Sequence, residues 1–338
     1  MDCLLFEEKR ERERDINFVG GRMVLVACFT GTAFRHLPWL VPHNRKDIFD
    51  SKKKRTVSIC SARLQDNFTE RLGFIGCGHM AGAIIRGFIA AGIPGDLIHA
   101  TTRTQLSADN AKQLGVGHIS SDNRHLVESC DMIFLAVKPQ SLDPVLRQLR
   151  ESVNSEVLYQ KLFVSIAAGK TCEQIASQLG ESNRVRVLRV MPNLPVAVGH
   201  VAGAYCADRH VDPKDIDRVV KLFSLVGQLE QVDENCMEAV TALCGSGPAF
   251  VYMFLEALAD GAVRQGLNRK VANRLALEMV YGASKLAKKD DLHFAQLRNQ
   301  VESPAGTTVY GTAALESGHF RTAIIHAIQE AVQRAKQL

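Results

Sequence analysis

A glycine-rich run directly after a short apolar strand constrains this chain most. The apolar residues Leu72–Ile75 are followed by Gly76-Cys77-Gly78-His79-Met80-Ala81. Gly76 permits a tight turn out of the strand, and Gly78 lets the backbone approach a pyrophosphate. Ala81 lets the next helix pack closely on the sheet, with its N-terminus toward the phosphates. The run predicts a dinucleotide site, although an ordinary strand-to-helix turn has the same pattern.

Apolar strands and helices alternate after this run. We expect a helix over Ala81–Ala91 and further strands over Leu97–Thr101, Met132–Val137 and Leu162–Ala167. Continuous apolar runs are typical of parallel strands that are buried on both faces. The order predicts an α/β fold, a Rossmann-type doubly wound parallel sheet with right-handed crossovers.

The pattern becomes helical from Asp233 onward. Helices are expected over Ala249–Gln265, from the cap Asn268 to about Ala287, up to Gly318, and from His319 to the C-terminus. The apolar surface of the last helix is wide, which favours burial against another subunit, with packing inside the domain as the alternative. We expect three parts: a poorly ordered extension (1–70), a dinucleotide-binding domain (71–232) and an all-α substrate-binding and dimerisation domain (233–338).

Composition narrows the function classes. The formal charge is +5 over 338 residues, and much of the basic excess precedes residue 71, so a nucleic-acid partner is not expected. The nine cysteines are scattered without a Cys-x-x-Cys pattern, so we expect reduced thiols and no metal site. We find no apolar stretch of about 20 residues and expect no membrane span.

The N-terminal segment has a basic stretch. Residues Arg22–Arg63 contain nine basic and two acidic residues, as a transit peptide would if translation began at Met23. The acidic start after Met1 favours a poorly ordered extension instead. We therefore expect a cytoplasmic protein, with a mitochondrial location as the alternative.

The end of the second strand predicts the cofactor type. The sequence Thr101-Thr102-Arg103-Thr104 has no acidic residue where an NAD-preferring site would place one for the ribose 2′-hydroxyl. Arg103 suits a 2′-phosphate instead. We therefore expect NADPH as the preferred cofactor and NADH as the second; Arg103 as a plain surface arginine is the alternative.

Three other strand ends and one late loop carry candidate site residues. Lys138 and Asn193 offer polar groups, and Ala168 is small and leaves room for a flat nicotinamide. Each follows an apolar strand, where ligands bind in doubly wound sheets. Much later, Val301–Tyr310 places hydroxyl side chains around Pro304 and Gly306, just before a helix. Exposed N–H groups at a helix start can bind a carboxylate, although an ordinary N-cap has the same residues.

Several motifs occur together in one order. They are Phe-Ile-Gly-Cys-Gly-His-Met-Ala, Ala-Val-Lys-Pro, Ser-Ile-Ala-Ala-Gly, Met-Pro-Asn-Leu-Pro, Ala-Leu-Cys-Gly-Ser-Gly-Pro-Ala, Leu-Ala-Asp-Gly and Glu-Ser-Pro-Ala-Gly-Thr-Thr. Over residues 71–338 the chain resembles the pyrroline-5-carboxylate reductase family. The resemblance implies reduction of the cyclic imine 1-pyrroline-5-carboxylate to L-proline, the last step of proline synthesis. It also implies a homodimer that often builds a pentamer of dimers.

The resemblance implies roles for individual residues. By this resemblance, the pyrophosphate is contacted by Ile75, Gly76, Cys77, Gly78, His79 and Met80. Thr102 and Arg103 match the 2′-phosphate region, and Asn123 matches an adenosine-side contact. The rest of the cofactor cleft is matched by Ala136, Lys138, Ala168 and Asn193. Substrate contacts fall to Ser303, Gly306, Thr307, Thr308 and Asp291, with the Thr308 hydroxyl as the catalytic group at the ring nitrogen. Three residues depart from the family pattern: His79 replaces an amide side chain, Ala305 a glycine and Cys244 a serine.

Two other functions fit parts of the sequence. A β-hydroxyacid dehydrogenase would also join a dinucleotide domain to helices, but it needs a lysine after the Gly-x-Gly of its helical domain, and Ala249–Leu255 contains none. A non-enzymatic NADP-binding sensor or scaffold could share the first half of the chain. Such a protein would not need Ser303 and Thr308.

Overall fold

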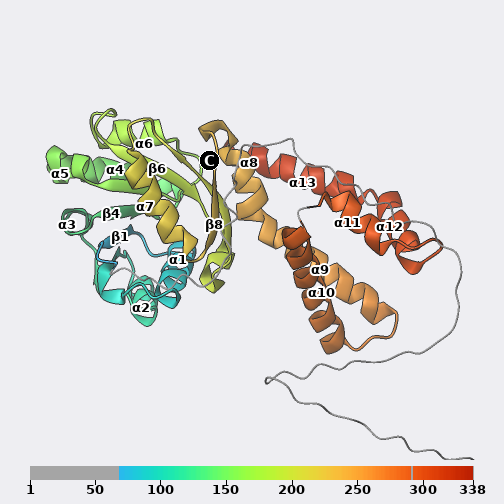
Figure 1. Ribbon diagram of the computed structural model, residues 1–338. Helices are drawn as coiled ribbons and strands as arrows, with labels where there is room; N and C mark the ends of the chain where they lie inside the picture. Colours follow the sequence, from blue (N-terminus) through green and yellow to red (C-terminus); the bar gives the residue numbers. More distant parts are fainter. Residues whose placement is uncertain (1–67, 291, 338) are drawn as a thin grey trace, which may run out of the picture. The chain divides into compact units, whose positions relative to one another are not determined.

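The computed structural model describes residues 68–290 and 292–337, all of which belong to one compact unit of the chain, Ile59–Leu338 (Figure 1). The strands are β1 (Leu72–Ile75), β2 (Ile98–Thr101), β3 (His118–Ser120), β4 (Met132–Leu135), β5 (Leu162–Ser165), β6 (Arg186–Met191), β7 (Val201–Ala207) and β8 (Gly227–Gln231). The helices among them are α1 (His79–Ala90), η1 (Gly95–Leu97), α2 (Gln105–Gln113), α3 (Asn123–Ser129), α4 (Pro139–Ser152), α5 (Ser155–Gln160), α6 (Cys172–Leu179), η2 (Leu194–Val198) and α7 (Pro213–Ser224). We call residues 68–231 the sheet half.

Helices alone follow the last strand. They are η3 (Glu234–Cys236), α8 (Met237–Val240), the π-helical turn η4 (Thr241–Ser246), α9 (Gly247–Arg264), α10 (Arg269–Asp290), α11 (Phe294–Val301), α12 (Thr307–Ser317) and α13 (Phe320–Ala335). The expected cap is present, since the Asn268 side chain accepts from the N–H of Lys270, and Pro248 lies in the first turn of α9. We call residues 234–337 the helical half.

One eight-stranded sheet has the order β3-β2-β1-β4-β5-β6-β7-β8. Strands β1 to β6 are parallel in the Rossmann order, β7 is antiparallel to β6, and β8 is parallel to β7. The fold class is confirmed, and β7 and β8 extend the sheet beyond the strands that were expected. The order reverses between β1 and β4, where doubly wound sheets bind their ligands.

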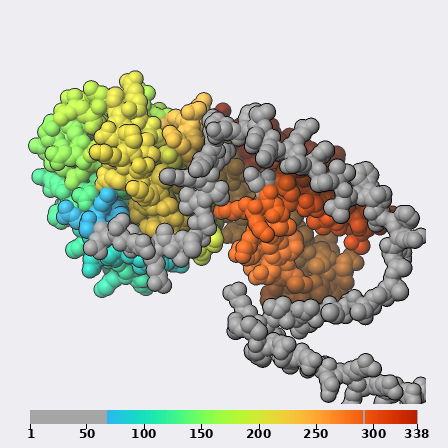
Figure 2. All heavy atoms as spheres, in the orientation of Figure 1, coloured from blue at the N-terminus to red at the C-terminus, as the bar shows by residue number. Residues whose placement is uncertain are grey.

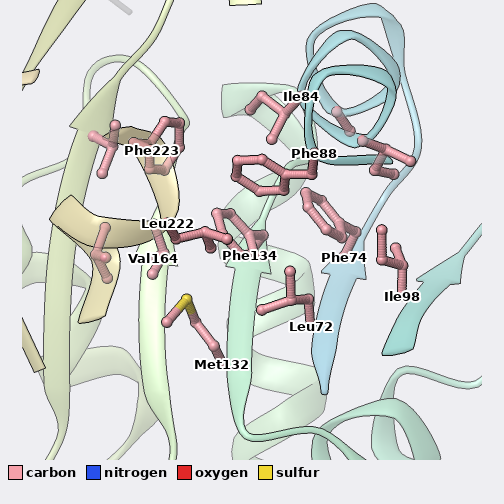
Figure 3. Packing of buried hydrophobic residues seen from close by; sticks show 14 of the residues in the cluster. Leu72, Phe74, Ile84, Phe88, Ile98, Met132, Phe134, Val164, Leu222 and Phe223 are labelled. Atoms are coloured by element: carbon pink, nitrogen blue, oxygen red, sulfur yellow. The ribbon is translucent and has the colours of Figure 1, made fainter. Parts of the chain in front are cut away.

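Side chains alternate along the central strands and fill two cores. Phe74 of β1 and Phe134 of β4 stack with centroids 4.4 Å apart beneath Phe88 of α1 and Phe223 of α7 (Figure 3). Ile133 and Leu135 point to the other face, where they join residues from α3, α4, α5 and α6. The sheet half is therefore a three-layer body with its own apolar core on both faces.

The helical half buries very little of its own apolar surface. Its separate core cluster has only three buried residues, Ala259, Ala272 and Ala276. Larger apolar side chains stay exposed on every long helix; they include Tyr252, Met253, Leu275, Leu277, Tyr281, Phe294, Tyr310, Leu315, Ile324 and Ile325. Figure 2 shows side chains of these helices, orange to dark red, at the surface. An open cavity of about 600 Å³ between α9 and α10 is lined by both apolar and polar side chains: Tyr252, Met253, Leu255, Glu256, Asp260, Arg269, Asn273 and Leu277. Exposed apolar side chains gathered on one surface mark an interaction site.

One helical run corrects the expectation that no apolar stretch is long enough to span a bilayer. Residues Glu234–Arg264 form a continuous 31-residue run, apolar and long enough for a span by length and composition alone. The π-helical turn η4 carries the helix through Gly245 without a break, so the run is longer than the sequence suggested.

Two residues before the predicted boundary at residue 70 contact the sheet half. Phe68 already packs against the core, and Glu70 pairs with Arg218 of α7 at 2.8 Å. Phe68 and Glu70 therefore belong to the folded sheet half, with partners that lie far along the chain. Residues 1–67 lie outside the described part, and the predictions made for them stay predictions.

Candidate functional site

The glycine-rich turn after β1 has the geometry of a phosphate site. Gly78 is the N-cap of α1, no side chain caps the helix, and the first turn contains no acidic residue. The first N–H groups of this 12-residue helix are therefore available, and the helix dipole favours an anion there. His79 and Gly78 are exposed at this end.

Gly76 and Gly78 have different roles in this turn. Gly76 has φ +92, and a Cβ there would lie 2.9 Å from Val137 Cγ1 and 3.0 Å from the Ala136 carbonyl oxygen. Only glycine fits, and it brings the turn against the end of β4. A Cβ on Gly78 would meet nothing within 4 Å, so the missing side chain leaves open space beside the helix start. Both features fit a bound pyrophosphate.

Two residues of the expected pyrophosphate set can contribute only through their backbone. The Ile75 side chain lies in the core, and its carbonyl already accepts from Ala136 N–H at 3.0 Å. Cys77 packs against the other core, and burial raises the pKa of its thiol. The thiol is therefore neutral near the phosphate site, and the cradle consists of main-chain groups.

The adenosine side lies where β2 ends. The Asn123 side chain, at the start of α3, accepts from Thr101 Oγ1 at 2.7 Å and donates to Gln148 Oε1 at 2.9 Å. The Gly76 N–H donates to Thr101 Oγ1 at 3.3 Å. Thr101 and Gln148 were not expected, because both act across more than 20 residues of sequence and no local pattern marks them.

The expected 2′-phosphate contacts lie just beyond β2. Thr102 is half-buried, and its N–H donates to the Ser120 carbonyl at 2.9 Å. Arg103 is exposed and forms no ion pair with any residue in the described ranges. A free guanidinium beside a Rossmann strand end can pair with a phosphate.

The rest of the expected cleft lies at the carboxyl ends of β4, β5 and β6. Lys138 is exposed at the start of α4, and Ala136 and Ala168 are half-buried beside it and after β5. Asn193 is buried between two prolines, where its Oδ1 accepts from Ala202 N–H at 3.1 Å. The sheet thus gathers all the expected cofactor residues along one edge, which we call the cofactor edge.

The residues Ser303–Thr308, which we call the substrate loop, form a turn and then a helix start. Gly306 N–H donates to the Ser303 carbonyl at 3.0 Å, with Pro304 second and Ala305 third in the turn. Ala305 has φ +57, a left-handed conformation that favours glycine. A Cβ on Gly306 would lie 2.3 Å from Ser303 Oγ, so a side chain at this position would displace the Ser303 hydroxyl.

Helix α12 begins without a side-chain cap. Gly306 is its N-cap, and Thr307 and Thr308 occupy the first two helical positions of an 11-residue helix. Glu302 braces the loop, since its carboxylate accepts from Thr312 Oγ1 at 2.8 Å and lies 3.5 Å from Arg298. Free N–H groups beside the Ser303 and Thr308 hydroxyls suit a ligand carboxylate. Asp291 lies outside the described residues.

One cluster of metal-ligating types occurs in the described ranges: Cys172, Cys206 and Glu234. It does not fit a metal ion, because the Glu234 carboxylate is already bound by Arg189 Nη1 at 2.6 Å and by Cys172 N–H at 3.1 Å. The hydrogen bond to Cys206 and burial raise the pKa of the Cys172 thiol, which keeps it protonated.

Arg189 is a second feature that the sequence did not reveal. It is 1% exposed on β6, and its Nη2 lies 3.6 Å from Glu238 of α8. It therefore ties the sheet half to the first helices of the helical half. Burial opposes ionisation of Glu234, but the Cys172 N–H and Arg189 together hold its pKa below the usual range.

Comparisons with known proteins agree with both halves. The family described as pyrroline-5-carboxylate reductase dimerisation matches residues 234–338, and the one described as NADP oxidoreductase coenzyme F420-dependent matches residues 71–185. The chain is 40% identical to a pyrroline-5-carboxylate reductase of Methanosarcina acetivorans, over 80% of this chain and 98% of the relative. It is 36% identical to one of Arabidopsis thaliana, over 79% and 95%.

Solved structures of the same name share the fold. The chain is 34% identical to a reductase of Coxiella burnetii, with a TM-score of 0.71 over 80% of this chain and 98% of that one. A Plasmodium falciparum pyrroline carboxylate reductase with NADP bound is 29% identical, also with a TM-score of 0.71 and the same coverage. The relatives match in sequence and fold through both halves, so the chain belongs to the pyrroline-5-carboxylate reductase family.

Proposed function

We propose that the protein reduces 1-pyrroline-5-carboxylate to L-proline, with NADPH as the preferred reductant and NADH as the second. The observation that carries the proposal is the uncapped start of α12, which places free N–H groups beside Ser303 and Thr308. A chain with only a dinucleotide site would not need this loop. The β-hydroxyacid dehydrogenase alternative is set aside by the family.

The substrate loop fits a ring that carries a carboxylate and an imine. The N–H groups at the start of α12 and the Ser303 hydroxyl would hold the carboxylate, with Gly306 and Thr307 shaping the backbone around it. The Thr308 hydroxyl would hold the ring nitrogen, the atom that gains a proton on reduction. Asp291 stays in the proposal as a substrate contact on the strength of the family resemblance alone.

The cofactor edge fits a phosphorylated dinucleotide. The main chain of Gly76 to Met80 would hold the pyrophosphate, Thr102 and Arg103 the 2′-phosphate, and Asn123 the adenosine ribose. When bound, the reduced nicotinamide would supply the hydride that the imine carbon accepts, the carbon that becomes C5 of proline. Ala136, Lys138, Ala168 and Asn193 would border the nicotinamide and orient it, so that the chain contributes mainly proximity.

The functional unit that we propose is a homodimer, with a pentamer of dimers as the larger assembly. No hydrogen bond or ion pair joins the substrate loop to the cofactor edge within the described part of one chain, and the helical half leaves its apolar side chains exposed. A second copy would cover that surface. We propose no membrane and no nucleic-acid partner, since Glu256 and Asp260 interrupt the apolar run with charges that a bilayer disfavours.

A coupled pair of variants tests the function. Wild-type protein with the imine and NADPH should form proline, and Thr308→Ala should lower kcat by about 100-fold with a smaller change in the Kd of NADPH. Thr308→Ser retains the hydroxyl and should recover most of the rate. Proline formation by Thr308→Ala at the wild-type rate would remove the residue from the mechanism. NADPH binding without turnover in the wild type would favour a sensor.

A second assay tests the cofactor preference. Arg103→Ala should raise the KM of NADPH by about 10-fold and leave the KM of NADH unchanged, because only NADPH carries the 2′-phosphate. Arg150→Ala, an exposed arginine at the end of α4, is the matched control. Equal effects on the two cofactors would exclude the role of Arg103.

A further inference from the structure

We propose that Thr101 is a positioning residue for the cofactor, which holds the glycine-rich turn and the amide of Asn123 in one fixed arrangement. The inference rests on the proposed binding of NADPH at the cofactor edge. Thr101 is the last residue of β2 and is 4% exposed, so its side chain acts on a ligand through its neighbours.

The Thr101 hydroxyl lies between two parts of the site. It donates its one proton to Asn123 Oδ1 at 2.7 Å and accepts from Gly76 N–H at 3.3 Å. The same Gly76 N–H donates to the Thr101 carbonyl at 3.2 Å. The turn that holds the pyrophosphate and the residue on the adenosine side are therefore joined through one oxygen atom.

This arrangement sets the orientation of the Asn123 amide. Because Oδ1 faces the Thr101 hydroxyl, the two amide N–H groups are the donors that remain. One of them donates to Gln148 Oε1 at 2.9 Å. No acceptor in the described ranges bonds the other, which suits an oxygen of the cofactor's ribose or phosphate. A reversed amide would put an acceptor in that place.

Burying a hydroxyl at this position costs desolvation free energy that packing alone does not offset. Valine has nearly the same shape and a high strand propensity, and it would need no hydrogen bond in a buried site. Thr101 lies under the turn, where its two hydrogen bonds satisfy the hydroxyl and link Gly76 to Asn123. We therefore assign its role to the geometry of the cofactor edge.

The test compares Thr101→Val with Thr101→Ser in the full-length protein. Thr101→Val keeps the shape and removes both hydrogen bonds, so the Kd of NADPH should rise by about 10-fold. Thr101→Ser keeps the hydroxyl and should stay within about threefold of wild type. The KM of the imine should stay within about twofold in both. Thr101→Val that binds NADPH as tightly as wild type, or Thr101→Ser that binds as weakly as Thr101→Val, would overturn the proposal.

A double-mutant cycle shows whether Thr101 acts through Asn123. Adding Thr101→Val to Asn123→Ala should weaken NADPH binding by less than about threefold, and a full additional 10-fold loss would contradict the linkage. If Thr101→Val does not fold, Gln148→Ala takes its place. This change at an exposed residue removes the second hydrogen bond of the Asn123 amide and should raise the Kd of NADPH by about threefold. An unchanged Kd in Gln148→Ala would then count against the proposal. Failure of the wild type to bind NADPH would instead reject the proposed function.

Discussion

The sheet half and the helical half satisfy their apolar side chains in different ways. The sheet half buries Phe74, Phe134 and Phe223 within itself, between helices of the same chain. The helical half has three buried alanines in its separate core and leaves tyrosines, leucines and isoleucines exposed. From the hydrophobic effect we therefore expect the sheet half to be stable as a single chain, and we propose that the helical half is stabilised by another copy.

The two halves also hold different parts of the proposed active site. The cofactor edge is formed by strand ends whose positions the sheet core fixes. The substrate loop belongs to the helical half, which we propose is covered by a second copy. We therefore expect cofactor binding to survive dissociation of the dimer and turnover to depend on the dimer.

The largest effect should come from the core of the sheet half. Phe134→Ala removes a fully buried ring that stacks on Phe74, so it should lower the free energy of unfolding by about 3–5 kcal/mol. The loss should be the same at every protein concentration. Phe294→Ala, which removes an exposed ring on α11, should act only through assembly and so show a concentration-dependent melting temperature. A concentration-dependent loss in Phe134→Ala would contradict the contrast.

A smaller effect should appear at the surface of the helical half. Leu277→Glu places a charge on an exposed apolar face of α10 and should weaken the dimer by about 2 kcal/mol, or about 30-fold in Kd. The same change at Leu106, an exposed leucine on α2 of the sheet half, is the matched control. Sedimentation equilibrium measures both. Equal dimer affinity in Leu277→Glu and wild type would show that this face of α10 is not covered.

The ion pair between the halves should give a pH-dependent effect. Glu234→Gln loses the charge that pairs with Arg189 and should cost about 1–2 kcal/mol at pH 7. The pKa of Glu234 is lowered in the folded state, so its contribution is present above the unfolded pKa of about 4.3 and is lost as the pH falls through the folded value. The melting temperatures of wild type and Glu234→Gln should therefore converge below about pH 4. Glu151→Gln, at an exposed residue, is the control. Curves that stay equally far apart at low pH would exclude this linkage.

The smallest effect concerns the turn of the substrate loop. Ala305→Gly relieves the left-handed strain of an L-residue but frees the unfolded chain, so a net gain of about 0.5 kcal/mol is expected. Ala313→Gly, in the middle of α12, should instead cost about 1 kcal/mol. Melting temperatures at one protein concentration compare the two. A loss of stability in Ala305→Gly would contradict the strain at this turn.

The sequence predicted the elements whose signals are local. The turn at Gly76, the cap at Asn268 and the loop at Pro304 to Gly306 each depend on neighbouring residues, and the structure has each of them. Strand β7 was missed, as were β3, which has three residues, and β8, which is mostly polar. Neither β3 nor β8 has the apolar pattern that marks a buried strand.

Long-range partners account for the rest of what was missed. Thr101 reads as an ordinary strand residue until Gly76 and Asn123 are seen beside it. Arg189 looks like a polar interruption of a valine-rich strand until Glu234 and Glu238 supply its charge partners. Which face of the helical half is covered depends on a second chain, and no pattern within one chain records it.

We propose that NADPH held at the cofactor edge delivers its hydride to an imine carbon held by the substrate loop. The direct test uses NADPH that carries deuterium at C4, in each of its two stereochemical forms, with 1-pyrroline-5-carboxylate and the wild-type protein. Mass spectrometry should find one deuterium at C5 of the proline with one form and none with the other. Consumption of NADPH with no deuterium in proline from either form would contradict the account.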